Sequence, residues 1–364
     1  MQASTFFDLL RFSLGIVDQL ETEPTDADWQ ALFEQADQQS LVGVFFHAIE
    51  RLPKERQPKD KQIRFTWLAA SEMLGQANKT INEHAAAIVK AFEADGFGCC
   101  LLKGQGNALL YPNPALRNPG DIDLWVTRDG KTAVREVLSY VRKKSAKADK
   151  AVYHHIDYGE YEGTEIEIHY RPSFMHQPWH NRQLQRFFER EAQAQASHRV
   201  AMGGGEVSVP TLAFNRIYLL VHITRHLLQH GIGLRQFVDY YYVLRQDITP
   251  QERTYTTEVL RQCGLTDAAG AVMYVMQQLF WLDDDHLIAK PDEWRGRFVL
   301  QEIMLGGNFG MYDKRVSQFA RTTSIGHNIQ RLRHDWRTLR YFPSESLWEP
   351  IFRLWHFVWR LSPR

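Results

Sequence analysis

Cysteine is scarce in this sequence, and neither sign of charge is in excess. The three cysteines of the 364 residues, Cys99, Cys100 and Cys263, do not have the spacing of a metal site. A reducing, cytoplasmic compartment is the simplest inference. The 43 Lys and Arg residues equal the 43 Asp and Glu residues, so no overall field attracts nucleic acid or an anionic membrane. We expect no stable binding of nucleic acid, and any anionic ligand must be held by a local site.

Long apolar runs are also missing. No stretch of about 18 residues is apolar and free of charge, which argues against a transmembrane segment. Residues 1–24 lack the basic start and the uninterrupted apolar core of a signal peptide. With 44% hydrophobic and 24% charged residues, the composition is that of an ordinary globular protein.

The period of the apolar residues divides the chain into three regions. Residues 1–96 have helical periodicity that ends at Asp95-Gly96, a helix stop. Residues 97–179 contain short apolar or alternating runs, turn residues and one helical stretch. Helical periodicity returns over residues 180–364, where residues 200–210 look like a Gly-tipped hairpin. We predict an α+β fold, with a small mixed β-sheet core flanked by N-terminal and C-terminal helical regions.

Two runs in the middle region alternate acids with hydrophobic residues. "DIDLWV" places Asp121 and Asp123 on one face of a strand and its aliphatic residues on the other. "TEIEIHYRP" repeats the pattern with Glu165, Glu167 and His169. Burying two neighbouring carboxylates costs several kcal/mol each unless a cation compensates. No Lys or Arg alternates with the acids of the first strand, so a divalent metal ion is the simplest partner.

The chemistry of these acids favours magnesium. Hard oxygen ligands suit Mg²⁺, which normally shares its shell between carboxylates and substrate phosphates. Two such ions, about 3.5 to 4 Å apart, can activate an attacking oxygen and stabilise a leaving one. We predict Asp121, Asp123 and Glu167 as metal ligands and catalytic residues, with Glu165 as the alternative to Glu167. His169 is expected to orient a carboxylate rather than to bind the metal.

A phosphate-bearing substrate also needs hydrogen-bond donors. The turn "KGQGN" follows a buried strand, and Gly104 lets backbone amides approach a ligand at a helix start. Lys103, Gln105 and Arg117 are predicted to contact phosphate oxygens. As alternatives, Lys103 is a cation at a strand end, and Arg117 is the counter-ion of the acid pair.

These motifs together resemble the nucleotidyltransferase superfamily, which includes DNA polymerase beta and the aminoglycoside nucleotidyltransferases. That superfamily combines a Gly-rich turn, an Asp-x-Asp or Asp-x-Glu strand and a later acid. The chain resembles more closely a family of bacterial nucleotidyltransferases over about residues 100–310. The motifs that carry this closer resemblance are "LLKG", "LLYPNPALRNPGDIDLWV", "IEIHYRP", a His-rich helix and "GNFG" at 307–310.

The resemblance implies roles for particular residues. Gly104 corresponds to the turn glycine, Asp121 and Asp123 to the metal-binding pair, and Glu167 to the third carboxylate. Gln105 departs from the pattern, because many members have Ser or Gly there. The implied activity is Mg²⁺-dependent transfer of a nucleoside monophosphate from a nucleoside triphosphate (NTP), with release of pyrophosphate. The acceptor hydroxyl belongs to a small molecule or a protein, and the alternative function is that of an inactive nucleotide-binding regulatory or scaffold protein.

A histidine series occurs in the predicted helix that begins near residue 211. His222, His226 and His230 share one face, but no acid lies at a suitable spacing. We interpret them as packed or hydrogen-bonded side chains, with a metal site as the alternative. Arg225 and His230 also match the Arg-x4–6-His arrangement of HEPN-type helical ribonucleases, which gives a further alternative function.

Two charge patterns in the C-terminal region have structural interpretations. Arg235 and Asp239 lie four residues apart on a helix, and we predict that they pair. Residues 315–364 contain nine Arg, three acids and four Trp. We interpret this segment as amphipathic helices that pack on the body with Arg outward. Docking on a membrane surface or on nucleic acid is the alternative.

Overall fold

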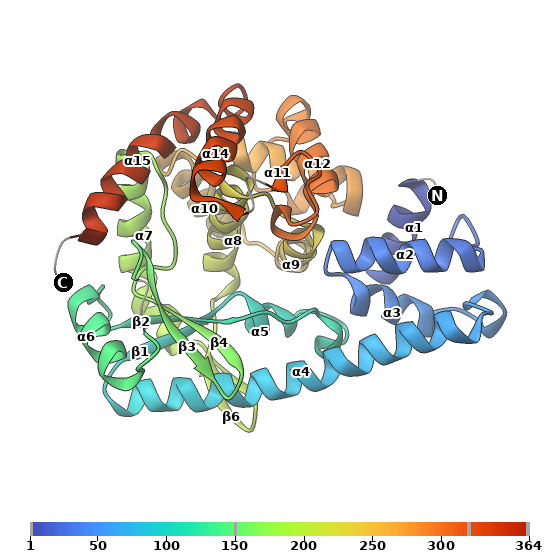
Figure 1. Ribbon diagram of the computed structural model, residues 1–364, viewed down its shortest axis with the longest axis horizontal. Coiled ribbons are helices and arrows are strands. Elements are labelled where there is room, and N and C mark those ends of the chain that lie inside the picture. Colours follow the sequence, from blue (N-terminus) through green and yellow to red (C-terminus); the bar gives the residue numbers. More distant parts are fainter. Residues whose placement is uncertain (1–2, 149–150, 319–321, 362–364) are drawn as a thin grey trace.

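Helices precede and follow a small sheet in the computed structural model, which describes residues 3–148, 151–318 and 322–361 (Figure 1). The N-terminal helices are α1 (Ala3–Ser13), α2 (Asp26–Gln38), α3 (Val42–Arg51) and α4 (Lys61–Ala94). The C-terminal helices are α7 (Pro178–Ser197), α8 (Leu212–Gln229), α9 (Leu234–Leu244), α10 (Pro250–Gln262), α11 (Thr266–Phe280), α12 (Glu293–Gly306), α14 (Ser324–Leu339) and α15 (Pro343–Leu361). This arrangement confirms the predicted α+β fold. Within the described residues, no helix has the length and apolar character needed to cross a membrane.

The central sheet is mixed, as the sequence predicts. Its strands are β1 (Gly98–Leu102), β2 (Ile122–Thr127), β3 (His155–Tyr161) and β4 (Thr164–His169), in the order β1-β2-β4-β3. Strands β2 and β4 are parallel, whereas the outer pairs are antiparallel. A short helix, α5 (Gly104–Ala108), follows β1, and α6 (Val134–Lys144) connects β2 to β3. The parallel register places Asp123 directly opposite Glu167.

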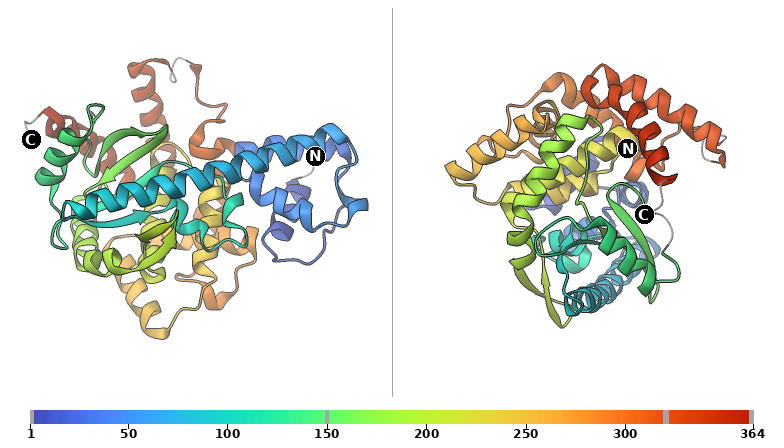
Figure 2. Two further views of the ribbon diagram at one scale, coloured as in Figure 1. Left: turned by 90° about the horizontal axis from the view of Figure 1, so that it is seen from below. Right: turned by 90° about the vertical axis from the view of Figure 1, so that its left-hand side faces the viewer.

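The alternation of β2 divides its side chains between two apolar cores. Ile122 and Leu124 pack in a core that includes Ile88 of α4. Trp125 belongs to the other core, where its ring stacks on Phe214 of α8 at 5.7 Å between centroids. Figures 1 and 2 show α4 on one side of the sheet and the C-terminal helices on the other. Asp123 of β2, which shares a face with Trp125, therefore points toward the C-terminal helices.

The predicted hairpin forms and packs on the long helix α4. Strands β5 (Arg199–Met202) and β6 (Gly205–Ser208) pair antiparallel around a Gly-rich tip. At Gly203, φ is +57°, and a Cβ atom would lie 2.0 Å from the carbonyl oxygen of Asn82. Only glycine fits there, because both the backbone angle and the close approach to α4 exclude a side chain. Helix α4 ends at Asp95-Gly96, with Gly96 at φ +82°, as the sequence predicts.

Candidate active site

A cavity of about 400 Å³ lies between the acidic face of the sheet and the C-terminal helices. Six of the seven predicted site residues line it: Lys103, Gly104, Arg117, Asp121, Asp123 and Glu167. The seventh, Gln105, is buried and turns toward α4. Its Nε2 atom donates to the Oδ1 atoms of Asn78 and Asn82, at 3.1 and 2.7 Å. In this structure Gln105 ties α5 to α4, since the α5 turn directs its side chain away from the cavity.

The acids form a compact cluster across β2 and β4. The Nε2 atom of His169 lies 2.8 Å from Oδ1 of Asp123 and 3.2 Å from Oε2 of Glu167. Ligand atoms of these three residues all lie within 4.8 Å of one another, close enough to hold one metal ion. Asp121 precedes β2 and is exposed, whereas Asp123 is only 3% exposed. Glu165, the alternative third ligand, is exposed near the start of β4.

Lys103 is the counter-ion of the buried acid. Its Nζ atom lies 2.8 Å from Oδ1 of Asp123. The side chain reaches this position from a strained turn, since φ is +52° at Lys103 and +36° at Gly104. Such conformations in a non-glycine residue persist only where the surroundings impose them. Lys103 is thus an internal partner of the acid cluster rather than a surface cation.

The pKa values of the three carboxylates are shifted in different directions. Burial alone would raise the pKa of Asp123, but the charge of Lys103 and the hydrogen bond from His169 hold it below its usual value. Burial opposes ionisation of Glu167 as well, yet hydrogen bonds from His155 and His169 hold its pKa well below the usual range. At Asp121, the negative charge of Asp123 raises the pKa to about 6. Two carboxylates therefore stay ionised, and the third lacks a sufficient counter-charge.

Arg117 is paired with an acid from another element. Its Nε and Nη2 atoms donate to the two carboxylate oxygens of Asp239 at 2.8 and 2.7 Å, and Tyr111 donates to Oδ1 at 2.7 Å. The predicted pair of Arg235 with Asp239 is wrong. Arg235 instead donates to the carbonyl oxygens of Asn118 and Pro119, at 3.2 Å each. Tertiary packing brings Arg117 to Asp239 and outcompetes the local i,i+4 pairing.

Several cavity residues were not predicted for this site. They include His154 and His155 of the β3 region, Arg225, Arg235 and Phe309. His155 contacts Glu167 at 3.0 Å, and the hydrogen bonds that it donates to the carboxylates of Asp157 and Glu167 outweigh burial and raise its pKa to about 9. The i, i+3, i+4 spacing of His222, Arg225 and His226 is a signal that could have placed the arginine with the histidines. Phe309 lies in the "GNFG" motif at 307–310, which carries the family resemblance but does not by itself place the ring in the cavity.

Helix α8 contributes the histidine series to the same cavity. His222 and His226 pack against each other, with 4.3 Å between ring centroids, which confirms the packed interpretation for these two. Burial lowers the pKa of both well below the usual value, so both are neutral. His230 lies at the end of α8 and lines the cavity together with Arg225. The ribonuclease-like pair is thus part of the cavity that contains the acids.

The family of the chain follows from comparison with known proteins. A family model described as "Uncharacterised nucleotidyltransferase" matches residues 25–281. The chain belongs to this nucleotidyltransferase family. It is accordingly an enzyme that transfers phosphorus-containing groups. No curated protein and no solved structure gives a significant match.

The matched range of this nucleotidyltransferase does not include the whole cavity wall. It contains the sheet, the acid cluster and helices α8 to α11. Helices α12, α14 and α15 follow it, yet α14 and α15 complete the cavity with Arg331, Phe352, Arg353 and His356. The acids therefore lie within the family region, and one wall of the cavity comes from residues beyond it.

Proposed function

We propose that this nucleotidyltransferase moves a nucleoside monophosphate from an NTP to an acceptor hydroxyl, with release of pyrophosphate. The observation that supports this most strongly is the register of β2 and β4, which sets Asp123 opposite Glu167. Asp121 lies two residues before Asp123 on the same edge of the cavity. Asp123 and Glu167 on two parallel strands, together with Asp121 just before β2, form a carboxylate ligand set suited to Mg²⁺.

In this proposal, each residue of the acid cluster has a distinct role. Asp121, Asp123 and Glu167 would hold two Mg²⁺ ions, which would supply charge neutralisation and activation of the acceptor oxygen. Glu167 remains ionised because two imidazoles hold its pKa low, which suits a ligand better than a proton acceptor. Lys103 compensates the charge of Asp123 in the absence of metal. His169 fixes the orientation of both strand carboxylates.

The triphosphate needs cations that the acid cluster does not already use. Arg225 and Arg235 meet this need, because their hydrogen-bond partners among the described residues are neutral. Arg225 donates to Nε2 of His154, and Arg235 donates to two backbone carbonyls. Burial lowers the pKa of both guanidinium groups, so an anion in the cavity would stabilise their charge. We assign them the phosphate contacts, in place of Gln105, which faces α4.

Replacing Arg225 with Gln is expected to weaken NTP binding about 10-fold to 100-fold, the range for loss of a charge-assisted hydrogen bond. The dissociation constant of a nonhydrolysable NTP is measured by calorimetry in the presence of Mg²⁺. The matched control is Arg261→Gln, an exposed arginine of α10 that pairs with Glu258. Equal affinity of the Arg225 variant and the wild type would contradict the assigned contact.

The reaction itself is tested by pyrophosphate release. The enzyme is incubated with each NTP, Mg²⁺ and pools of small hydroxyl compounds or proteins. Release that depends on an acceptor, together with covalent transfer of the labelled nucleotide, is the expected result. NTP binding without release in any pool would favour the regulatory function instead. RNA cleavage that depends on Arg225 and His230 but not on Asp121 would favour the ribonuclease function.

A further inference from the structure

Helix α15 turns its apolar side chains toward solvent. Six large apolar residues between positions 347 and 358 are 46–69% exposed: Leu347, Ile351, Leu354, Trp355, Phe357 and Val358. We call this set the α15 apolar face. By contrast, Glu345 and Glu349 of the same helix are only 6% and 1% exposed. Trp359 is buried and Phe352 stacks on Phe174, but most of the large apolar side chains of α15 face solvent, whereas the apolar stripe of a surface helix usually faces the core.

Buried polar contacts fix this orientation. Glu349 pairs with Arg331 of α14, and its Oε2 atom lies 3.1 Å from Nε of Arg353. Glu345 accepts a 2.6 Å hydrogen bond from the backbone N–H of His176. Rotating α15 to bury its apolar face would break these contacts of Glu345 and Glu349. The exposure of the apolar face is thus a consequence of specific contacts on the opposite side.

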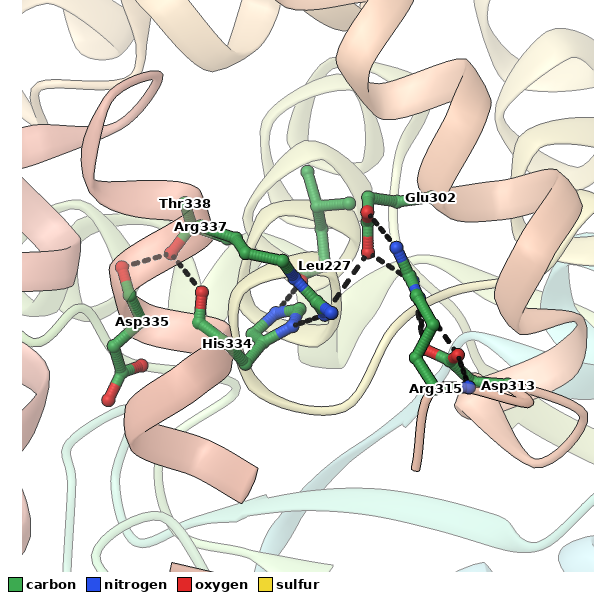
Figure 3. A network of polar contacts seen from close by, with 8 residues as sticks. All are labelled: Leu227, Glu302, Asp313, Arg315, His334, Asp335, Arg337 and Thr338. Atoms are coloured by element: carbon green, nitrogen blue, oxygen red, sulfur yellow. Dashed lines mark hydrogen bonds and ion pairs between the residues drawn. The ribbon is translucent and has the colours of Figure 1, made fainter. Parts of the chain in front are cut away.

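Helix α14 has the same orientation. Figure 3 shows its polar residues in a network with the body of the protein. His334 lies 2.8 Å from the carbonyl oxygen of Leu227, and Arg337 donates to Nδ1 of His334 at 2.9 Å. Arg337 also lies 3.6 Å from Glu302, which forms a bidentate pair with Arg315. The outward side of α14 carries the exposed apolar residues Ile329, Leu332 and Trp336.

In α14 and α15, the acidic residues lie on the inner side and the exposed charged residues are basic. Their three acids, Asp335, Glu345 and Glu349, are all buried. The exposed charged residues in the described parts of α14, α15 and their connection are arginines: Arg333, Arg340 and Arg360. The outer surface of this helix pair thus combines apolar and aromatic side chains with positive charge, and its carboxylates lie on the inner side.

We propose that α14 and α15 dock this enzyme on an anionic membrane surface. Aromatic and aliphatic residues on one face, accompanied by Arg, are typical of helices that lie in the headgroup region. The α15 apolar face spans roughly 160° at 100° per residue, which is wider than the narrow seam of a coiled coil. A second copy of the chain would also bring like-charged arginines together. Charge complementarity therefore favours anionic lipid over self-association.

Docking would place the active site close to the lipid. Phe352, Arg353 and His356 of α15 line the catalytic cavity on the inner side of the helix. The apolar face and the cavity are therefore separated by about one helix diameter, roughly 10 Å. The docked enzyme holds its cavity near the headgroups, and this placement does not depend on which group the enzyme transfers.

The experiment is co-sedimentation of the full chain with vesicles. Binding is expected to vesicles of phosphatidylcholine and phosphatidylserine, and to weaken as NaCl rises from about 0.1 to 0.5 M, because salt screens the arginines. Leu354→Glu should lower the partition coefficient at least about ten-fold. Arg360→Glu should reduce the preference for anionic over neutral vesicles. Met73→Glu is the matched control, because Met73 is 74% exposed on α4 and should leave binding unchanged.

Two results would overturn the proposal. One is the absence of sedimentation with anionic vesicles by a wild type that is folded and binds NTP. The other is a dimer in analytical ultracentrifugation that Leu354→Glu dissociates, with no vesicle binding, which would assign the face to a second copy. Thermal unfolding confirms that each variant is folded, and neither Leu354 nor Arg360 contributes to the cavity lining.

Discussion

Asp121→Asn is expected to lower nucleotide transfer at least about a thousand-fold and to leave the thermal unfolding midpoint unchanged or slightly raised. The loss of activity follows because the amide removes a negative charge from the proposed metal site, where electrostatic stabilisation provides most of the catalysis. The stability follows because Asp121 is exposed and its carboxylate lies in the field of Asp123.

The size of the stability effect depends on pH. The charge of Asp123 raises the pKa of Asp121 from 3.8 to about 6 in the folded protein. Ionised Asp121 is therefore disfavoured by folding at pH values above its ordinary pKa. In metal-free buffer at pH 7 to 8, Asn removes this repulsion. Below about pH 3, which lies under both pKa values of the wild-type carboxyl, the variant and the wild type should have the same stability.

Two comparison variants make this prediction specific. Glu165→Gln, at an exposed acid near the start of β4, should retain activity. Asp123→Asn should lose both activity and stability, because Lys103 and His169 would lose a buried charged partner. Transfer is measured with labelled NTP, and unfolding by calorimetry. An Asp121→Asn protein that transferred nucleotide at the wild-type rate would remove Asp121 from the metal site.

The sequence predicted the acid cluster because its signals are local. Period-two alternation is enough to put Asp121 and Asp123 on one face, and the same rule applies to Glu167. The parallel pairing of β2 with β4 sets Asp123 opposite Glu167. This pairing depends on the tertiary structure and cannot be predicted from the alternation of residues within either strand. The position of Glu167 between two isoleucines in mid-strand favours it over Glu165 as the third acid, and the structure places Glu167 in the cavity lining.

The cationic side of the cavity could not be predicted in the same way. Arg225 and Arg235 reach the cavity because α8 and α9 pack over the acidic face of the sheet, which depends on the assembled core. Gln105 was predicted to face phosphate from its place in the turn, but the direction of α5 points it at α4. For residues 315–364, the sequence predicts helices that pack on the body with Arg outward. Arg333 and Arg360 are indeed exposed, whereas Arg331 and Arg353 pair with Glu349 on the inner side.

Breaking the buried pair of Arg117 and Asp239 is expected to lower the free energy of unfolding by about 3 to 5 kcal/mol, because either single change leaves an uncompensated charge in the interior. Both residues are only 4% exposed. We expect this loss for Arg117→Leu and for Asp239→Leu. The double variant should recover most of it, except for about 1 to 2 kcal/mol from the hydroxyl of Tyr111, which would lose its acceptor.

The measurement is denaturation by urea, with free energies extrapolated to zero urea. Arg297 and Glu293 of α12 provide the control, because this i,i+4 pair is exposed on both sides. Single changes there should alter the free energy of unfolding by less than about 1 kcal/mol. Single-variant losses at Arg117 and Asp239 as small as those of the control, or additive losses in the double variant, would contradict the buried-pair account.

Activity of the double variant then decides between two roles of Arg117. The pair ties the segment before β2 to α9, and that segment leads directly to Asp121. If Arg117 acts by positioning this segment, the double variant should regain transfer together with stability. If Arg117 contacts substrate phosphate, as the sequence predicts, the double variant should fold and still bind NTP about 10-fold to 100-fold more weakly. The Nε and Nη2 atoms of Arg117 are engaged by Asp239, and its Nη1 atom donates to the carbonyl oxygen of Asn118. This favours the positioning role, because a phosphate would have to displace Asp239 from a bidentate geometry.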